Sequence, residues 1–320
     1  MPLRIRSAEP ADYAAIASIL DAYGVAGPPS AEQLRASDEA AGVRDASFRR
    51  LVAEQRGEVV ATGAFHAARA AVVDPGRLWM TLYLREDHRG LGIDGELLRS
   101  ALSELGGVTE IWTCVREDQL DPIGVVRAEG FDERFRSWGA RIDPQRFDAE
   151  PFSPLVRQLA SGGVRLERYA ELSADPDRDA RLVELQRRLE EDAIVFEPVI
   201  PQFLEDVTSP DTIPESVMVA VAPEAGQDAY VGLASLLGDA SRPALTCGFI
   251  GVERAYRRRG IATALLASVL RIARELGCRE LNAGGGGVDA SMMRISRRLG
   301  FEIEPAWITF ARQRDELSGT

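Results

Sequence analysis

The sequence predicts a mixed α/β fold, built as two similar domains in tandem. Short β-rich runs alternate with apolar runs of helical periodicity, one strand–turn–helix arrangement occurs twice, and a length of 320 residues suits two domains of average size. A hydrophobic content of 45% and a charged content of 28% are typical of a globular protein in water. Each half therefore has enough apolar side chains for its own core.

The repeat is visible as a set of aligned segments. The paired segments are His88–Leu98 with Tyr256–Leu266, Glu129–Phe131 with Leu299–Phe301, and Trp138 with Trp307. Because they all stand at nearly one offset, we interpret the chain as a duplication, with domains at 1–148 and 164–320. Residues 149–163 contain Pro151, Pro154 and the pair Gly162-Gly163, which predicts a linker.

The elements of each domain follow from hydrophobic period and turn residues. In the first domain we expect an opening element at Leu3–Arg6 similar to Val164–Leu166 of the second, a hairpin with Val59, Val60 and Phe65, a strand at Leu78–Leu84, a helix at Ile93–Leu105 and a strand at Ile111–Val115. In the second domain we expect a helix at Arg181–Asp192, a hairpin of Val217–Val221 and Tyr230–Leu237, strands at Thr246–Val252 and Glu280–Ala283, helices at Gly260–Leu276 and Ala290–Leu299, and a closing strand at Trp307–Arg312.

A turn rich in arginine and glycine opens one of these helices. Arg257-Arg258-Arg259-Gly260-Ile261-Ala262 joins the strand Thr246–Val252 to an apolar helical run. A small-residue turn at the start of a helix leaves backbone N–H groups unpaired, and the helix dipole adds partial positive charge there. The turn is therefore suited to hold a phosphate or pyrophosphate. The alternative is that Gly260 only ends a surface loop and the arginines are solvated.

The order Arg-x-x-Gly-x-Ala between a strand and a helix resembles the acyl-CoA-binding motif of the GNAT acetyltransferases. The segment Asp289 to Phe301 is similar to the second signature of that family, in which a helix ending at Leu-Gly-Phe flanks the pantetheine arm. The domain order resembles that of mycothiol synthase-like two-domain acetyltransferases. This resemblance implies two tandem GNAT domains, each with a mixed, mostly antiparallel six- to seven-stranded sheet flanked by helices.

The resemblance also implies where acetyl-CoA, the expected co-substrate, would bind. The backbone N–H of Ile250 would face the acetyl carbonyl, Val252 would pair with the pantetheine, and Arg257 to Thr263 would surround the pyrophosphate. The complete implied set is Ile250, Gly251, Val252, Arg257, Arg258, Arg259, Gly260, Ile261, Ala262, Thr263, Asp289 and Met292. The nearby run Gly284–Gly287 either brings backbone close to the ligand or forms a flexible loop. We expect no metal.

The second half contains no histidine, so the candidates for proton transfer there are a serine, carboxylates and a cysteine. Ser296 stands where many relatives carry a tyrosine acid, so it would hydrogen-bond the departing sulfur or be an ordinary polar helix residue. Glu191, Asp192 and Glu197 lie where the family builds its acceptor pocket, and they would bind a cationic amine or relay its proton unless they are merely solvated. Cys247 would suit a ping-pong scheme through an acyl-cysteine, but a small buried thiol is the simpler interpretation.

The two copies differ at the turn. Asp94 stands where the second copy has Ala262, and Gly90-Leu91 replaces two of the arginines. A carboxylate in the first turn of a helix would accept the free N–H groups and repel a phosphate. We therefore expect the first copy to be unable to bind CoA. The alternative is that Asp94 is an ordinary helix cap.

Composition limits the partners and the chemistry. A formal net charge of −12 disfavours nucleic acid and anionic membranes and is compatible with a cationic amine. All 38 basic residues are arginine, which excludes a lysine nucleophile. Cys114, Cys247 and Cys278 fit neither a disulfide framework nor a metal-ligand spacing. No run is apolar enough for a membrane span or a secretion signal, so we expect a cytoplasmic location.

Together these features predict an acyltransferase: an acetyl-CoA-dependent N-acetyltransferase that acts on a primary amine of a small molecule by direct attack in a ternary complex. One alternative is a peptide or protein N-terminal acetyltransferase, which would need an open groove. Another is a non-catalytic acyl-CoA-binding or sensing protein. We expect a monomer, as an internal pseudo-dimer, or a homodimer.

Overall fold

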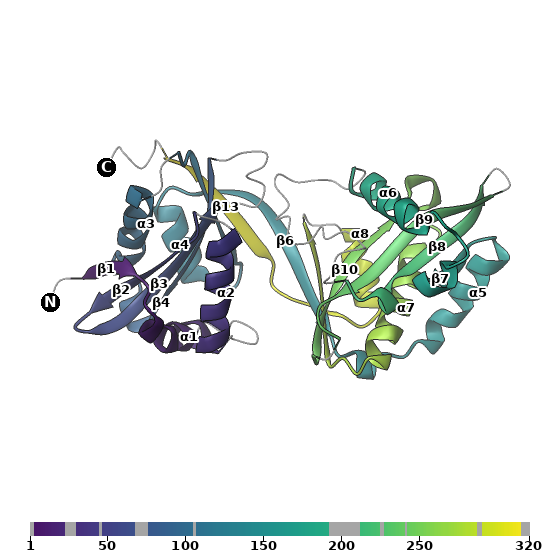
Figure 1. Ribbon diagram of the computed structural model, residues 1–320, viewed down its shortest axis with the longest axis horizontal. Coiled ribbons are helices and arrows are strands. Elements are labelled where there is room, and N and C mark those ends of the chain that lie inside the picture. The colour runs from purple at the N-terminus through teal and green to yellow at the C-terminus, as the bar shows by residue number, and fades with distance from the viewer. Residues whose placement is uncertain are drawn as a thin grey trace. The chain divides into compact units, whose positions relative to one another are not determined.

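The computed structural model describes residues 3–22, 30–44, 47–67, 76–104, 107–191, 212–224, 227–240, 242–286 and 290–314. The chain forms two compact units, whose elements are labelled in Figure 1. Unit 1 comprises Met1–Phe135 and Ile308–Thr320, and unit 2 comprises Arg136–Trp307. Both units are of the mixed α+β class that the sequence predicts, with mostly antiparallel strand pairing.

Unit 1 contains the first copy of the strand–turn–helix arrangement. Its elements are β1 (Arg4–Ser7), α1 (Tyr13–Ala22), α2 (Ala31–Arg44), β2 (Arg49–Gln55), β3 (Glu58–Ala67), β4 (Arg77–Leu84), η3 (Glu86–His88), α3 (Ile93–Glu104), β5 (Glu110–Arg116), α4 (Leu120–Ala128), the start of β6 (Asp132–Ile142) and β13 (Trp307–Gln313) from Ile308 on. The strands follow one another in the order β1-β2-β3-β4-β5-β13. Only β4 and β5 pair in parallel among the registers that are defined here.

Side chains of β2 show how this sheet acquires helices on both faces. Leu51 and Ala53 are buried in the core that includes α3, whereas Val52 between them is buried with Ile16 and Leu20 of α1. Successive side chains of a strand point to opposite faces. The apolar run in β2 therefore requires a helix layer on each side.

Unit 2 repeats this plan. Its elements are the end of β6, α5 (Ser153–Ser161), β7 (Arg165–Arg168), α6 (Arg178–Glu191), β8 (Met218–Glu224), β9 (Gln227–Leu237), β10 (Ala244–Val252), η9 (Arg254–Tyr256), α7 (Ile261–Glu275), β11 (Glu280–Gly286), α8 (Ala290–Arg298) and β12 (Glu302–Ile303). The strand order is β6-β11-β10-β9-β8-β7, and β12 pairs with β6. The pair β10–β11 is parallel, like its counterpart β4–β5.

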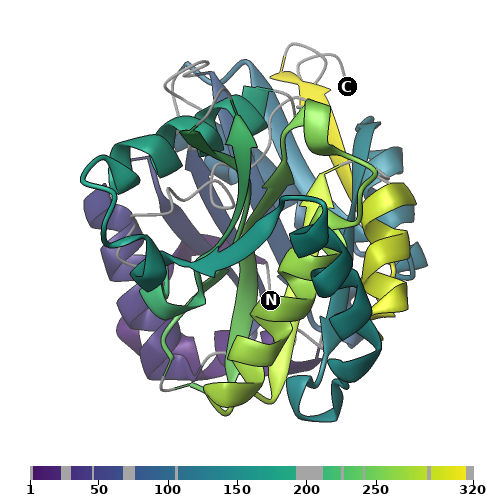
Figure 2. The ribbon, with the colours of Figure 1, turned by 90° about the vertical axis from the view of Figure 1, so that its right-hand side faces the viewer.

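Helices α6 and α7 cover opposite faces of the sheet in unit 2 (Figure 2). The odd-numbered valines Val217, Val219 and Val221 pack with leucines of α6. Met218 and Ala220, which alternate with them, pack with the apolar face of α7. This division places α6 and α7 on the two sides of the strand that leads into the arginine-rich turn.

The compact units differ from the expected domain boundaries at two places. The segment predicted as a linker, 149–163, contains α5, whose Leu159 is buried in the core of unit 2. Pro154 lies in the first turn of that helix, where proline is favoured, rather than in a loop. The strand predicted to close the second domain instead lies in unit 1, where Phe310 is fully buried. None of the described helices is long and apolar enough to cross a membrane.

Candidate active site

The parallel strands β10 and β11 pair at only one end. Ala244–Thr246 pair with Glu280–Asn282, and beyond that point β11 keeps β6 as its partner. Within the described residues, no strand pairs with the β11-facing edge of β10 from Gly248 to Val252. Backbone N–H and C=O groups along this edge are therefore available to a ligand that lies alongside the strand.

A β-bulge lies in the same part of β10. The register with β9 shifts between Cys247 and Ile250, so that Gly248 and Phe249 stand opposite the single residue Ser235. A Cβ on Gly248 would collide with the Oγ of Ser235, so this position requires glycine. A bulge bends its strand and locally ends regular pairing. Gly248, a glycine inside the predicted strand, is the sequence signal for this bulge.

The turn after β10 has the backbone that the anion-binding hypothesis requires. Gly260 is the N-cap of α7 with φ of 88°, and Arg258 also has a positive φ of 67°. The N–H of Tyr256 donates to the carbonyl of Glu253 at 2.9 Å, and that of Ala264 donates to the carbonyl of Gly260 at 3.0 Å. Between them, no backbone N–H from residue 258 to 263 donates to another described residue. These free N–H groups lie at the positive end of the α7 dipole.

Two of the three arginines have partners within the turn. The Nε of Arg257 donates to the carbonyl of Val252 at 2.9 Å, which ties the turn to the end of β10. Arg259 donates to the carbonyl of Ala255 at 3.1 Å and lies 5.0 Å from the ring centre of Tyr256. All three arginines are exposed. They add positive charge near the free N–H groups. We call these backbone N–H groups, from residue 258 to 263, the cradle.

Gly260 is held from behind by the helix that sequence analysis treated as a linker. A Cβ on Gly260 would lie 2.7 Å from the Cδ1 of Leu155 in α5. Ile261 and Thr263 are buried, and Ala262 packs against the core of unit 2. The sequence signal for this contact was Leu155, Val156 and Leu159 after a proline, which is a helix start with one apolar face.

Ser296 is completely buried on α8, at 0% exposure. Its Oγ has no hydrogen-bond partner among the described residues. A buried hydroxyl without a partner is unfavourable, and such a group in a native fold calls for an explanation such as a ligand or water. Met292, on the same helix, packs against the core of unit 2. Asp289, which precedes the helix, lies outside the described residues.

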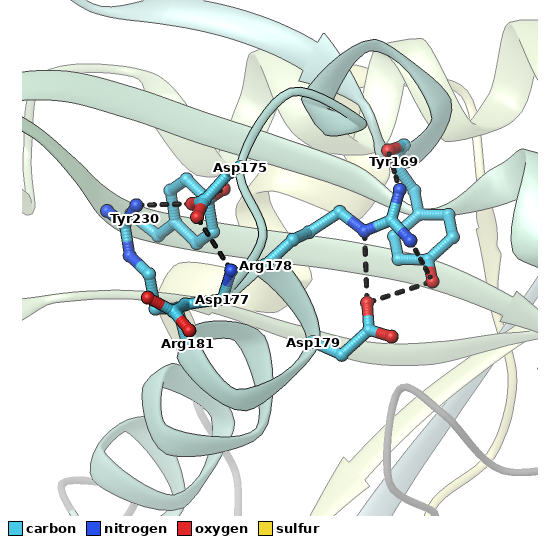
Figure 3. A network of polar contacts seen from close by, with 7 residues as sticks. All are labelled: Tyr169, Asp175, Asp177, Arg178, Asp179, Arg181 and Tyr230. Carbon is cyan, nitrogen blue, oxygen red and sulfur yellow. Dashed lines mark hydrogen bonds and ion pairs between the residues drawn. The ribbon is translucent and has the colours of Figure 1, made fainter.

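Helix α6 is fixed at its beginning by a network of tyrosine, arginine and aspartate side chains (Figure 3). Arg178 stacks over the ring of Tyr169 at 3.7 Å, and Arg181 stacks over that of Tyr230 at 4.0 Å. The hydroxyl of Tyr230 donates to Asp175 at 2.6 Å. Burial and the nearby Asp175 carboxylate raise the pKa of Tyr230, so the phenol stays neutral at any physiological pH.

The last turn of α6 lies against β10. The Cδ1 of Leu189 is 3.0 Å from the Cβ position of Gly251, and Arg188 pairs with Glu253 at 2.7 Å. The other end of this helix thus reaches the start of the arginine-rich turn. Glu191 is the last residue of α6, and nothing of its side chain is described. Asp192 and Glu197, the other carboxylate candidates, lie outside the described residues.

Cys247 is unsuited to an acyl-cysteine scheme. Burial raises the pKa of its thiol to about 12. The thiolate is the nucleophilic form of cysteine, and at neutral pH this side chain is almost entirely the thiol. Cys247 is half-buried, and its thiol is shielded from water enough to stay protonated.

The glycine run forms a strand through Gly286 and not a loop. Gly284 pairs with Gly139, and a Cβ on Gly284 would lie 2.8 Å from the carbonyl oxygen of Trp138. Close backbone approach is therefore the reason for glycine at this position. Gly287, the last of the run, lies outside the described residues.

The first copy has the same backbone turn with a different charge. Gly90 and Gly92 have positive φ of 74° and 77°. The aligned residues of the second copy, Arg258 and Gly260, also have positive φ, of 67° and 88°. Asp94 is 8% exposed, and its side chain makes no hydrogen bond to the described residues, so the predicted capping contact is absent. A carboxylate oxygen of Glu129 is 3.4 Å from the Cβ position of Gly95. One arginine, Arg89, and two carboxylates therefore stand at this helix start, in place of three arginines.

Comparison with known proteins decides the family. A model of the acetyltransferase (GNAT) family matches residues 14–131 and 182–301, which together are well over half of the chain. The chain belongs to this family. Each matched segment falls on one copy of the repeat, so the protein is a tandem GNAT acetyltransferase, and the predicted class of enzyme, an acyltransferase, is confirmed.

Solved structures share the fold of this GNAT protein. A GCN5-related N-acetyltransferase from Sphaerobacter thermophilus is 20% identical with a TM-score of 0.72, covering 97% of this chain and 95% of that one. A tandem GNAT protein from the clavulanic acid biosynthesis pathway is 17% identical with a TM-score of 0.64, covering 98% of both chains. At these identities the likeness concerns the fold. No curated protein sequence matches the chain.

Proposed function

We propose that unit 2 of this GNAT protein transfers an acetyl group from acetyl-CoA to a primary amine of a small molecule in the cytoplasm. One observation carries the proposal: the unpaired edge of β10 leads directly into a turn with free N–H groups at the start of α7. An extended amide chain fits along such an edge, and a pyrophosphate fits at its end. Pantetheine and the diphosphate of CoA have this order and chemistry.

The residues present fit acetyl-CoA. The peptide groups from Ile250 to Val252 would pair with the pantetheine amides, and those from Arg258 to Thr263 would bind the pyrophosphate. Gly260 allows the positive φ at the start of α7, and the exposed arginines add positive charge. When bound, acetyl-CoA supplies the acetyl group as a thioester. Asp289 and Met292 belong to the proposed set through their position at the start of α8.

Direct transfer requires three things of this chain. The ammonium of the acceptor must lose a proton, the carbonyl must be polarised while the C–N bond forms, and the sulfur must receive a proton as the C–S bond breaks. A backbone N–H near the bulge would polarise the carbonyl. The buried hydroxyl of Ser296 would donate a hydrogen bond to the sulfur. Glu191, Asp192 or Glu197, at and beyond the end of α6, would take the proton from the amine through water.

Calorimetry and a turnover assay test the proposal. We expect wild type to bind one acetyl-CoA per chain and to release free CoA thiol with small primary amines. Gly260→Glu should weaken binding at least about 100-fold, because its Cβ would collide with Leu155 and shift the backbone of the turn, and because it adds a negative charge near the free N–H groups. Gly277→Glu is the matched control: Gly277 also has a positive φ, of 78°, but lies at the far end of α7 with open space around it.

Both variants carry the cost of a left-handed non-glycine residue, about 1–2 kcal/mol, and Gly260→Glu alone also displaces Leu155, so urea unfolding of both variants accompanies the titration. Unchanged affinity in Gly260→Glu would refute the assigned site. Two sites per chain would refute the inactive first copy. A wild-type protein that binds acetyl-CoA but acetylates no small amine, while it acetylates peptide N-termini, would replace the proposed acceptor by a peptide.

A further inference from the structure

Two strands of unit 2 present a surface of three glycines and one serine next to the unpaired edge of β10. Leu281 and Ala283 of β11 pack into the core shared with α7. Because side chains alternate along a strand, Gly284 and Gly286 lie on the α6 side of the sheet after Asn282. Their partners on β6 are Gly139 and Ser137. This four-residue surface, which we name the glycine floor, begins one strand away from β10.

A carboxylate lies over the far side of the glycine floor. Glu304 follows β12, and its backbone N–H donates to the carbonyl of Gly139 at 2.9 Å. Its Oε2 is 3.0 Å from the position that a Cβ on Gly139 would take. The Glu304 side chain is 28% exposed. Glycine at position 139 thus allows the carboxylate to lie across β6 and to remain open to solvent.

The arginine beside Glu304 does not occupy all the hydrogen-bond acceptor positions of the carboxylate. Arg141 approaches the Oε1 of Glu304 at 3.8 Å and pairs more closely, at 3.4 Å, with the exposed Glu302. A carboxylate has two oxygens and about four acceptor positions. The Oε2 over the floor therefore remains able to accept hydrogen bonds from a cationic group.

The aligned positions in the other copy are filled. Cys114 aligns with Gly284, and the residue beside it, Thr309, is 1% exposed and donates to the Sγ of Cys114 at 3.8 Å. The copy whose turn carries arginines thus has the bare floor, and the copy whose turn carries carboxylates does not. A strand of this family can accept side chains at these positions, so the floor is a particular property of the unit with the free cradle.

The strand order fixes the approximate distance from the floor to the acetyl position. Glu304 lies over β6, and β11 separates β6 from the β10 edge. Two strand spacings amount to on the order of 10 Å, and since β10 and β11 no longer pair beyond Thr246 this is the smallest separation. A group at Glu304 is therefore too far away to contact an amine nitrogen that attacks a carbonyl beside β10. It can hold a different part of the same acceptor.

We propose that Glu304 binds a second cationic group of the acceptor, so that the preferred acceptors of unit 2 are diamines whose nitrogens are separated by about two strand spacings. This inference rests on the proposed function, since it assumes that an amine is acetylated beside β10. The glycine floor holds the chain between the two nitrogens, and Glu304 selects the distance. Glu304 is thus a specificity-determining residue and not the base.

Acetylation kinetics with 1,7-diaminoheptane, heptylamine and 1,3-diaminopropane test the inference. In wild type we expect KM for diaminoheptane to be at least tenfold lower than for the other two amines. Glu304→Gln should remove that difference, with kcat within threefold and acetyl-CoA affinity unchanged. Glu302→Gln, which removes a carboxylate that also pairs with Arg141, is the matched control and should change nothing. Gly139→Ala, which displaces the Glu304 carboxylate, should act like Glu304→Gln.

Two results would overturn the inference while the proposed function stands: equal KM values for heptylamine and diaminoheptane in wild type, or equal effects of Glu304→Gln and Glu302→Gln. If wild type acetylates no amine, the proposed function fails. Calorimetric titration of diaminoheptane into the CoA-loaded protein then decides the role of Glu304 by itself. Binding that is lost in Glu304→Gln supports the cation site, and absence of binding to wild type refutes it.

Discussion

Ser296 combines complete burial with a hydroxyl that has no partner among the described residues. Replacement by alanine removes an unsatisfied polar group, so Ser296→Ala should leave the free energy of unfolding unchanged or raise it by up to about 1 kcal/mol. If the hydroxyl bonds the departing sulfur, kcat should fall about tenfold with acetyl-CoA affinity unchanged. Steady-state kinetics and urea unfolding measure both. Ser291→Ala, at an exposed position of the same helix, is the control. A wild-type kcat in Ser296→Ala would remove Ser296 from the mechanism.

The pKa of Cys247 makes stability depend on pH in the alkaline range. Burial raises this pKa from 9.0 to about 12. Between these values the unfolded chain releases the thiol proton and the folded chain keeps it, so unfolding becomes more favourable as pH rises. The contribution of this thiol to the free energy of unfolding is complete below pH 9. Above pH 9 it falls by about 1.4 kcal/mol per pH unit.

Urea unfolding of wild type and Cys247→Ala at pH 8 and pH 10 checks this effect. From pH 8 to pH 10, the free energy of unfolding of wild type should fall by about 1 kcal/mol more than that of the variant. Parallel losses in the two proteins would show that Cys247 is not shielded. In that case the acyl-cysteine scheme would deserve a direct test by trapping the acyl-enzyme.

Strand β13 stands at the end of the second copy in the sequence but packs in the unit formed by the first copy. It belongs to the second copy of the repeat, yet Ile308 and Phe310 are buried in the core of unit 1. Gln313 also bonds Glu110 of β5 at 3.0 Å, and Arg314 bonds the carbonyl of Val108 at 3.3 Å. The first half of the chain therefore lacks a strand that its own core requires.

Phe310→Ala should destabilise unit 1, by about 3–5 kcal/mol, because it empties a fully buried position. Hydrogen exchange should show lost protection in β2–β5, far away in sequence, with β8–β10 protected as in wild type. The reciprocal variant is Phe301→Ala, nine residues earlier, which lies in the core of unit 2 and should deprotect β8–β10. Loss of protection in β8–β10 from Phe310→Ala would contradict the assignment of β13.

Helix α5 shows why a linker prediction from composition fails. Proline and paired glycines mark loops, but Pro154 lies in the first turn of a helix and Gly162 ends it. The apolar residues between them then pack behind Gly260 and into the core. A proline at the start of a segment and a glycine at its end are compatible with both a loop and a short helix. Packing against α7 decides between the two.

At the scale of the whole molecule, the two units share a backbone and differ in charge. The turns before α3 and α7 have left-handed residues at aligned positions and the same pattern of hydrogen bonds. One turn carries three arginines, and the other keeps only Arg89 and has Asp94 and Glu129 nearby. Since this difference in charge favours a phosphate at the first turn and disfavours one at the second, we expect acetyl-CoA to bind in unit 2 alone.

The sequence by itself determined the class of the fold, the duplication, the family and the position of the arginine-rich turn. These depend on local patterns: period, a glycine that allows positive φ, and a helix start. Only the tertiary structure decided the exchange of β13 into unit 1, the bulge opposite Ser235, the buried hydroxyl of Ser296 and the carboxylate of Glu304 over Gly139. Each of these is a contact between residues far apart in the chain. Such contacts arise from strand register and packing, which no local pattern specifies.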